Sequence, residues 1–345
     1  MNTTFWQPII AKYQKPHLRR SIWQIVNSFV PYLILWYLMQ LSLEISYWLT
    51  LGLSILAAGF LVRIFIIFHD CGHGCFFKSR KANDIWGYIT GILTLTPYHQ
   101  WRHDHAVHHA TSSDLDRRGV GDIWTLTVEE YLKSPRLTKI LYRVYRNPLV
   151  LFGIGGVYMI LIRQRFPSRA AASRERGSVF WTNLALAGLM VLMSFTVGFV
   201  NTVLIYFPIL LISSAAGVWL FYVQHQFEGA YWEQGENWDY VAAALQGSSF
   251  YNLPRVLQWF SGNIGFHHIH HLSPRIPNYH LEKCHKNSAL FSQVKRVTLF
   301  SSLKSFAFRL WDEEGQRLVS YRFLKKSLKE KLNDTIPTLR DGSDT

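Results

Sequence analysis

Eight histidines of this chain fall into three groups in which the imidazoles are three or four residues apart. The groups are His69 and His73; His105, His108 and His109; and His267, His270 and His271. On a helix, residues at these spacings share one face, so each group would present its imidazoles together. Imidazole nitrogen binds zinc, copper, iron and nickel. Because a tetrahedral zinc takes four ligands, eight imidazoles suit two metal ions, whose identity the ligand type does not fix.

A ninth histidine, His225, ends an apolar run and is a further candidate ligand. Glu228 follows it by about one helical turn and is a candidate to orient its ring through the second nitrogen, as Asp70 is for the first group. His268 is left out of the ligand set, because on a helix it points about 100° away from its neighbours. The other histidines are expected outside the site. Four further carboxylates are weaker candidates to orient a ligand ring, and the alternative for each is a loop cap or a salt bridge: Asp114, Asp116, Asp122 and Asp239.

The composition favours a membrane protein. Hydrophobic residues make up 49% of the chain, aromatic residues 15% and charged residues only 17%, below the usual quarter. The net charge of +14 would also fit a nucleic-acid partner. The long apolar runs instead favour cytoplasmic loops beside anionic lipid, so no nucleic-acid partner is expected. The three cysteines form no Cys-x-x-Cys pair and are expected to be reduced thiols.

Four apolar runs predict four transmembrane helices arranged as two hairpins, since each is near the ~20 residues that cross a bilayer. They cover about residues 29–45, 47–68, 179–200 and 202–223. Lysine and arginine number 4 in residues 1–28, 16 in residues 69–178 and 15 in residues 224–345, with none in either hairpin turn. The positive-inside rule then places both termini and all three histidine groups on the cytoplasmic side. Arg63, inside the second run, is expected to reach the cytoplasmic interface.

The expected fold is an all-α integral membrane protein with a cytoplasmic cap that carries a two-metal site. Two shorter apolar stretches, 85–98 and 149–162, are expected to be interfacial or re-entrant, and interfacial is preferred, because a single crossing would separate the histidine groups. Three divisions are expected: a cytoplasmic segment 1–28, the site-bearing domain 29–310 and a cytoplasmic tail 311–345. Within the domain, residues 69–178 and 224–310 are expected to be cytoplasmic or interfacial. The tail is expected to be loose beyond Leu332.

The three groups resemble the histidine boxes of the membrane fatty acid desaturases. The matching boxes are His69-x-x-x-His73, His105-x-x-His108-His109 and His267-x-x-His270-His271, and the flanking residues 68–73, 121–124, 224–228 and 262–278 are similar as well. The similarity covers roughly residues 20–310 and is greatest to bacterial acyl-lipid desaturases of the Bacillus and cyanobacterial kind. It implies an enzyme of the bacterial plasma membrane, with two irons ligated by the eight box histidines and His225. It further implies O₂ as co-substrate and the acyl chain of a membrane phospholipid as substrate, which receives a cis double bond.

Two departures from the family pattern matter. The His-Pro-Gly-Gly motif of fused cytochrome b5 relatives is absent from the sequence, so electrons are expected from a separate ferredoxin-like or cytochrome b5-like carrier. In the animal acyl-CoA relatives an asparagine that binds metal through water stands one turn before the residue resembling His225, whereas Phe221 stands here. A di-iron hydroxylase of an alkyl or carotenoid substrate stays open as an alternative. A metal transporter or haem protein would need ionisable residues deep within the spans. The bond position is open among Δ5, Δ12 and Δ9.

Overall fold

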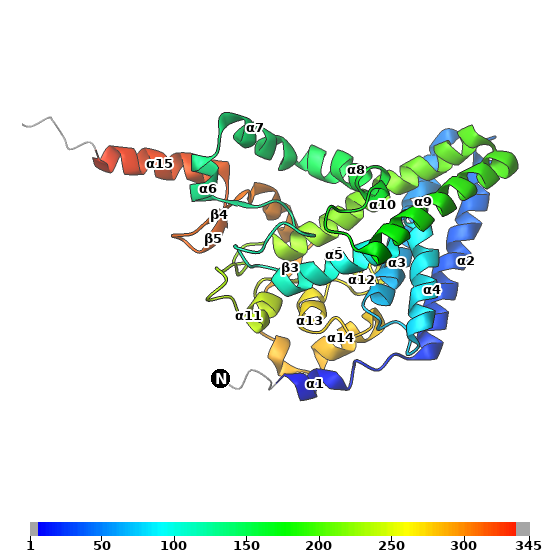
Figure 1. Ribbon diagram of the computed structural model, residues 1–345, viewed down its shortest axis with the longest axis horizontal. Helices are drawn as coiled ribbons and strands as arrows, with labels where there is room; N and C mark the ends of the chain where they lie inside the picture. The colour runs from blue at the N-terminus through cyan, green and yellow to red at the C-terminus, as the bar shows by residue number, and fades with distance from the viewer. Residues whose placement is uncertain (1–5, 336–345) are drawn as a thin grey trace, which may run out of the picture.

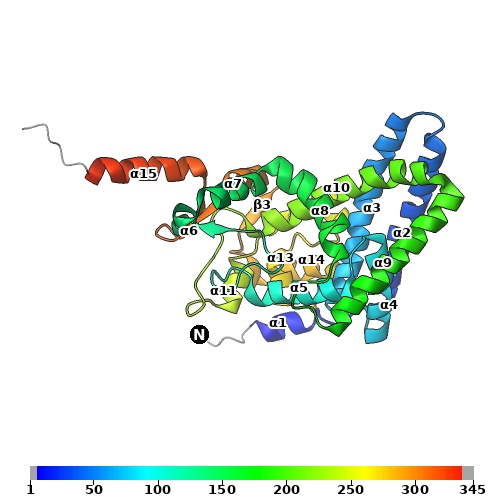
Figure 2. The ribbon, with the colours of Figure 1, turned by 45° about the horizontal axis from the view of Figure 1, so that its top comes forward.

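The computed structural model describes residues 6–335, with side chains through residue 331. Long helices gather on one side of the molecule, and short helices and strands form a cap against their ends (Figures 1 and 2). The long helices are α2 (Leu18–Ser42), α3 (Tyr47–Gly72), α9 (Ser173–Met193) and α10 (Phe199–His225). Within residues 6–335, three stretches have the length and composition to cross a membrane, namely Leu18–Ser42, Tyr47–Gly72 and the continuous Ser173–His225. The bent pair Arg136–Tyr145 and Leu149–Arg165, which turns by 69°, would add a fourth.

Helices α2 and α3 form a hairpin whose closing turn is joined by a 2.7 Å contact between the hydroxyls of Ser42 and Thr50. Helix α2 begins at Leu18, well before the apolar run that predicted it. Its extra turns are polar by composition, yet Ser21, Gln24 and Ser28 are buried. These three residues recur at helical spacing and give α2 an inward polar face that hydropathy alone does not detect.

The stretch Ser173–His225 is two limbs rather than one rod. A single helix of 53 residues would be about 80 Å long, more than twice the ~30 Å hydrocarbon thickness of a bilayer. Between α9 and α10 lies a π-helical turn, η3 (Ser194–Gly198), and Gly198 has a φ of +93°. That left-handed conformation favours glycine. The two limbs meet at this turn and diverge from it in both views (Figures 1 and 2).

Helices α4 (Arg80–Leu93) and α5 (Tyr98–Thr111) follow the first hairpin. Helix α4 packs along α3 and lies beside the long helices (Figures 1 and 2), whereas α5 packs against α9 and extends toward the cap. Gly87 of α4 lets the start of α5 pack closely against α4, because a Cβ at residue 87 would lie 2.2 Å from the ring of Tyr98. The stretch expected at 149–162 forms the π-helical η1 (Leu149–Gly155) and α8 (Gly156–Leu161).

The cap is built from short helices and two small sheets. Strand β4 pairs in parallel with β1 and antiparallel with β5, while β2 and β3 form a separate parallel pair. The strands are β1 (Leu126–Thr127), β2 (Phe250–Asn252), β3 (Arg296–Thr298), β4 (Leu310–Asp312) and β5 (Arg317–Val319). The remaining helices are α1 (Gln7–Ala11), α6 (Val128–Lys133), α7 (Arg136–Tyr145), η2 (Arg163–Arg165), α11 (Tyr240–Leu245), α12 (Arg255–Phe260), α13 (His267–Leu272), α14 (Asn278–Lys286), η4 (Ala289–Phe291), η5 (Ser301–Ala307) and α15 (Tyr321–Thr335).

Two local expectations need revision. The packed body extends past residue 310, because Trp311 of β4 is only 1% exposed and β5 pairs beside it; the last residues, 336–345, lie outside the described part. Arg63 is held within the protein. Its side chain is buried, its Nη1 donates to the carbonyl of Trp259, and its guanidinium carbon lies 3.9 Å from the centre of the Trp259 ring. A partner from a distant part of the chain thus satisfies this cation.

Candidate metal centre

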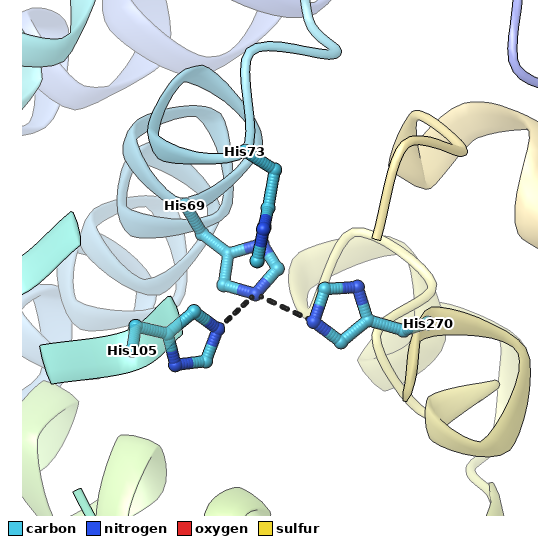
Figure 3. A group of neighbouring side chains, drawn as sticks. All are labelled: His69, His73, His105 and His270. Atoms are coloured by element: carbon cyan, nitrogen blue, oxygen red, sulfur yellow. Dashed lines mark hydrogen bonds between the residues drawn. The ribbon is translucent and has the colours of Figure 1, made fainter. Parts of the chain in front are cut away.

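The first cluster of imidazoles joins all three boxes. His69 lies in the last turn of α3 and His73 caps that helix, while His105 lies on α5 and His270 on α13. One ring nitrogen from each of the four lies within 4.8 Å of the others. Nε2 of His69 is 3.1 Å from Nε2 of His105 and 3.1 Å from Nε2 of His270 (Figure 3). These four rings therefore converge on one point from three helices.

The second cluster is made by His108 of α5, His225 at the end of α10, and His267 and His271 of α13. All four are buried, and one nitrogen from each lies within 4.8 Å of the others. Nε2 of His267 is 2.9 Å from Nε2 of His225 and 3.1 Å from Nε2 of His271. His225, which belongs to no box, is thus the fourth member of this cluster beside three box histidines.

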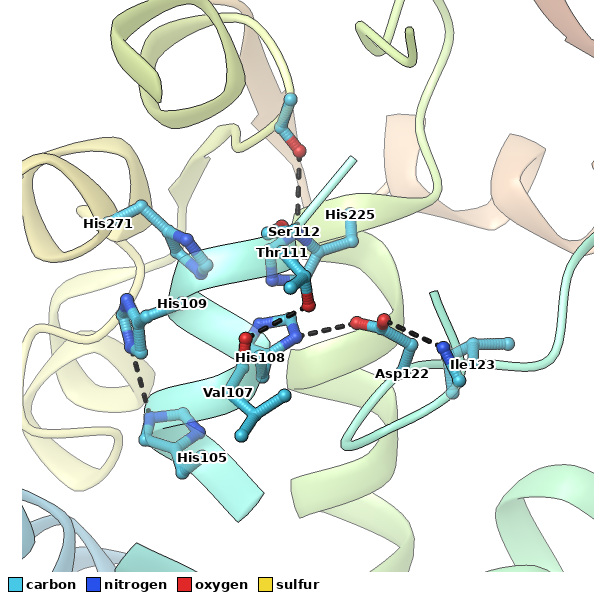
Figure 4. A network of polar contacts seen from close by, with 12 residues as sticks. His105, Val107, His108, His109, Thr111, Ser112, Asp122, Ile123, His225 and His271 are labelled. Carbon is cyan, nitrogen blue, oxygen red and sulfur yellow. Dashed lines mark hydrogen bonds and ion pairs between the residues drawn. The ribbon is translucent and has the colours of Figure 1, made fainter. Parts of the chain in front are cut away.

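His109 lies between the two clusters (Figure 4). Its Nε2 is 3.2 Å from Nε2 of His105, which belongs to the first cluster. Its ring stacks on that of His271, in the second cluster, with centroids 4.3 Å apart. The Nε2 atom therefore faces the first cluster while the ring plane packs against the second. All nine candidate ligands are brought together in two adjacent sets.

The nitrogen positions fit metal ions better than they fit a hydrogen-bonded imidazole cluster. Buried Nε2 atoms of His73 and His108 have no hydrogen-bond partner within the described residues. Ligands about 2.1 Å from a metal lie about 3.0 Å apart when cis at 90°, and about 3.4 Å apart at the tetrahedral angle. The closest separations here are 2.9–3.2 Å. Nitrogens that share one metal ion lie in this range.

Burial keeps the imidazoles in the form that binds metal. Desolvation, followed by the charges of neighbouring imidazoles, lowers the pKa of His105, His109, His267, His270 and His271 well below 6.5. Removing water from a cationic ring and placing other imidazoles beside it both penalise protonation. These rings are therefore neutral near pH 7, and each has one nitrogen lone pair free for a metal.

The first cluster is oriented by Asp70, as expected. Its Oδ1 lies 3.1 Å from Nδ1 of His69, so the Nε2 of that ring turns toward the cluster. Its Oδ2 accepts hydrogen bonds from the backbone N–H and the side-chain amide of Asn278, at 2.7 and 2.8 Å. Both residues are buried. Histidine spacing alone does not predict Asn278 as a supporting residue, although Asn278 ends the segment that resembles the family.

The second cluster is oriented by Asp122 and by a backbone carbonyl. Oδ1 of Asp122 is 2.6 Å from Nδ1 of His108 (Figure 4). Nδ1 of His225 lies 3.3 Å from the carbonyl oxygen of Gly247. Glu228, the expected partner of His225, is exposed, so this expectation was wrong. The chain leaves the helical path just after His225, which removes the one-turn relationship on which that expectation depended.

The other carboxylates considered from sequence have local roles. Asp114 accepts from the backbone of Asp116 and pairs with Arg117, Asp116 accepts from Gly235 N–H, and Asp239 caps α11. His268 turns away from both clusters, as its position on the helix predicts, and its Nε2 lies 3.1 Å from Nδ1 of His285. Trp101 packs directly on the site, with its ring stacked 4.3 Å from that of His105.

Comparison with known proteins identifies relatives of this chain. The family model described as fatty acid desaturase matches residues 46–300. The chain is 52% identical to a fatty acid desaturase of Bacillus subtilis, over 92% of this chain and 90% of that protein. It is 28% identical to an sn-1 oleoyl-lipid 12-desaturase of Synechocystis sp., over 74% of this chain and 71% of that protein.

A more distant relative names an electron carrier. The chain is 28% identical to the chloroplastic sn-2 acyl-lipid omega-3 desaturase (ferredoxin) of Arabidopsis thaliana, over 68% of this chain and 52% of that protein. These similarities confirm the resemblance carried by the three histidine boxes. The chain belongs to the fatty acid desaturase family of oxidoreductases.

Proposed function

We propose that this enzyme introduces a cis double bond into the acyl chain of a membrane phospholipid, using O₂ and two electrons from an external donor at a di-iron centre. Two vicinal hydrogens of the chain, two electrons and two protons reduce one O₂ to two water molecules, so the reaction balances. The observation that carries the proposal is the pair of adjacent imidazole clusters, built from helices that meet at the C-terminal ends of α3 and α10.

In this proposal nine histidines hold the irons. The first ion is assigned to His69, His73, His105, His109 and His270, and the second to His108, His225, His267 and His271. When bound, the irons and O₂ supply an oxidant strong enough to take hydrogen from an unactivated methylene, which no amino-acid side chain provides. The chain's part is to fix the rings, through the carboxylates of Asp70 and Asp122, and to surround them with apolar side chains.

Aromatic residues supply the dry surroundings. Trp101 covers His105, and its ring also packs 4.8 Å from that of Phe68. On the other cluster, the ring of Phe221 lies 5.0 Å from His108 and 5.1 Å from His225. An apolar ring thus occupies the position that in the animal acyl-CoA relatives would be a water-holding asparagine. Phe221 would therefore offer the second iron no side-chain amide at this position.

We further propose that the enzyme crosses the bacterial plasma membrane four times, through α2, α3 and the two limbs α9 and α10, with both termini and the histidines cytoplasmic. The charge distribution along the sequence and the break at Gly198 support this topology. In this arrangement, both clusters lie where the spans end. An acyl chain would then reach them from within the bilayer.

Expression in a bacterium that makes no unsaturated fatty acids tests the proposal. Mass spectrometry of the membrane lipids should find new monounsaturated chains, and their fragmentation gives the bond position. Exclusively hydroxylated chains would refute desaturation and favour the related hydroxylase.

A matched pair of variants tests the ligand set. His270→Ala should abolish the product and lower bound iron. His268→Ala, on the same short helix but facing His285, should keep both. Equal iron in the two variants would contradict the assignment.

A further inference from the structure

A basic cavity lies on the cap, away from the histidine clusters. Its volume is about 350 Å³, and its lining residues are Lys12, Tyr13, Arg20, His280, Lys283 and Asn287. It is formed where the segment between α1 and α2 meets α14. In Figure 1 these elements lie at the opposite end of the molecule from the turn between α2 and α3. In the proposed topology, that end faces the cytoplasm.

The charge around the cavity is unbalanced. Residues 6–20 and 273–287 contain seven lysines and arginines and a single carboxylate, Glu282, which pairs with Lys286. Within the part of the chain that the structure describes, Lys12, Arg20 and Lys283 have no carboxylate partner. Cations gathered without counter-charges repel one another and create a positive potential that attracts an acidic partner. This surface is therefore suited to bind an anion from outside the chain.

A short chain of bonds joins this cavity to the first histidine cluster. Nη1 of Arg20 donates to the carbonyl of Tyr279, the residue before the lining His280. On the other side of Tyr279, Asn278 donates its backbone and side-chain N–H groups to Oδ2 of Asp70. Oδ1 of Asp70 contacts Nδ1 of His69. Three consecutive residues of α14 and one carboxylate thus connect the cavity wall to a ring of the first cluster.

We propose that the basic cavity is the docking site of an acidic one-electron carrier protein and that electrons enter the first cluster through residues 278–280 and Asp70. The proposal rests on the proposed function, which requires an external donor. Each docking event oxidises one carrier and passes one electron to the centre, so two events supply the two electrons of one reaction. Complexes between redox proteins are small and short-lived, and opposite charges accelerate their formation. Three cations that have no carboxylate partner among the described residues, gathered at one cavity, fit such an encounter.

Two double variants with equal changes in charge test the docking site. Lys12→Glu/Lys283→Glu reverses two exposed cations at the cavity. Lys325→Glu/Lys329→Glu reverses two exposed cations on α15, which projects from the other side of the cap (Figures 1 and 2). The full-length proteins are placed in phosphatidylcholine nanodiscs, and the probe is an acidic plant-type [2Fe–2S] ferredoxin. Its Kd is measured by interferometry, and reduction of the centre is followed by stopped-flow absorbance.

At low ionic strength the cavity variant should raise the Kd for ferredoxin about tenfold and slow reduction by about the same factor. The α15 variant should change both by less than about twofold. Near 1 M salt, where the screening length is about 3 Å, the difference should disappear. Reduction by dithionite, which needs no docking, should be equal in all three proteins.

Other results would separate the two proposals. Equal ferredoxin affinity in the cavity and α15 variants would overturn the docking site while leaving the desaturase proposal intact. The docking site would also be overturned if the cavity variant lost binding only to phosphatidylglycerol vesicles, because the cavity would then bind a lipid head group. A wild-type protein that binds no iron would instead overturn the proposed function, whatever its affinity for ferredoxin.

Discussion

Asn278 donates two hydrogen bonds to the same carboxylate oxygen of Asp70, at 2.7 Å from its backbone and 2.8 Å from its side chain. The other oxygen of Asp70 contacts Nδ1 of His69. The segment that follows the third histidine box therefore fixes a ring of the first box. Holding one ring nitrogen fixes the orientation of the imidazole. The contact at Nδ1 therefore sets the direction in which Nε2 of His69 points into the first cluster.

Removing the asparagine side chain should loosen His69. Asn278→Ala keeps the backbone hydrogen bond to Asp70 but loses the side-chain one, so iron affinity should fall by roughly tenfold or less, whereas Asp70→Ala should cost about 10–100-fold. Iron retention against a series of chelators measures both. Asn237→Ala, in an exposed loop, is the control. If Asn278→Ala lowered the iron affinity as much as Asp70→Ala or more, Asn278 would not act on His69 through Asp70.

The second cluster should lose its metal separately. Asp122→Ala leaves Nδ1 of His108 without its 2.6 Å partner, so iron at that cluster should bind about 10–100-fold more weakly. After a mild chelator challenge, the variant should retain close to one iron per chain where the parent retains two. Asp116→Ala, whose carboxylate accepts from Gly235 instead, should behave as the parent does. Loss of both irons in Asp122→Ala would show that the clusters do not load independently.

Spacing along the sequence predicted which histidines meet, but not how they divide between the clusters. His108 and His109 are neighbours on α5, yet Nε2 of His109 lies beside His105 while His108 joins His225. The third box divides in the same way, with His270 in one cluster and His267 and His271 in the other. Helical periodicity fixes a shared face. The division depends on how the helices cross, which is set by tertiary packing.

The long helices could be predicted because apolar runs of bilayer length leave a strong signal in the sequence. Their extent and partners could not. The polar start of α2 is buried by packing, and Arg63 is satisfied by Trp259, far along the chain. Strands β4 and β5 have three residues each, too few to leave a periodic signal, so the sequence alone predicts a tail there. Hydropathy describes a residue's own preference, whereas these features depend on its neighbours.

A buried arginine binds the chain next to His225 to other parts of the cap. Arg146 is fully buried and donates to the carbonyls of Trp124 and Phe308, to the hydroxyls of Thr125 and Tyr222, and to Oε1 of Gln226. Gln226 follows His225 directly. A lysine cannot reproduce this fork of donors. Arg146→Lys should therefore leave buried acceptors unsatisfied and lower the free energy of unfolding by about 3 kcal/mol.

Thermal unfolding in detergent, together with iron content, measures that effect. Arg136→Lys, exposed at the start of helix α7, which Arg146 caps at its other end, should leave the Tm unchanged. An Arg146→Lys protein as stable as the Arg136→Lys control would show that the buried fork is not needed.

Acid should destabilise the protein and release its metal. Burial lowers the pKa of His267, His270 and His271 in the folded chain, whereas in the unfolded chain each imidazole titrates near 6.5. Above about pH 6.5 both states are neutral and the full stability is present. Below it the unfolded state binds more protons, so stability falls as pH falls, and protons also compete with iron for the same nitrogens.

The Tm and the iron retained after brief dialysis at about pH 7.5, 6.5 and 5.5 test this sign, and both should decrease toward acid. Repeating the series at high salt screens exposed charges but hardly affects buried groups. The acid loss should therefore persist at high salt. A Tm that rises on acidification, or a loss that disappears with salt, would mean that surface charges rather than the buried imidazoles govern the response.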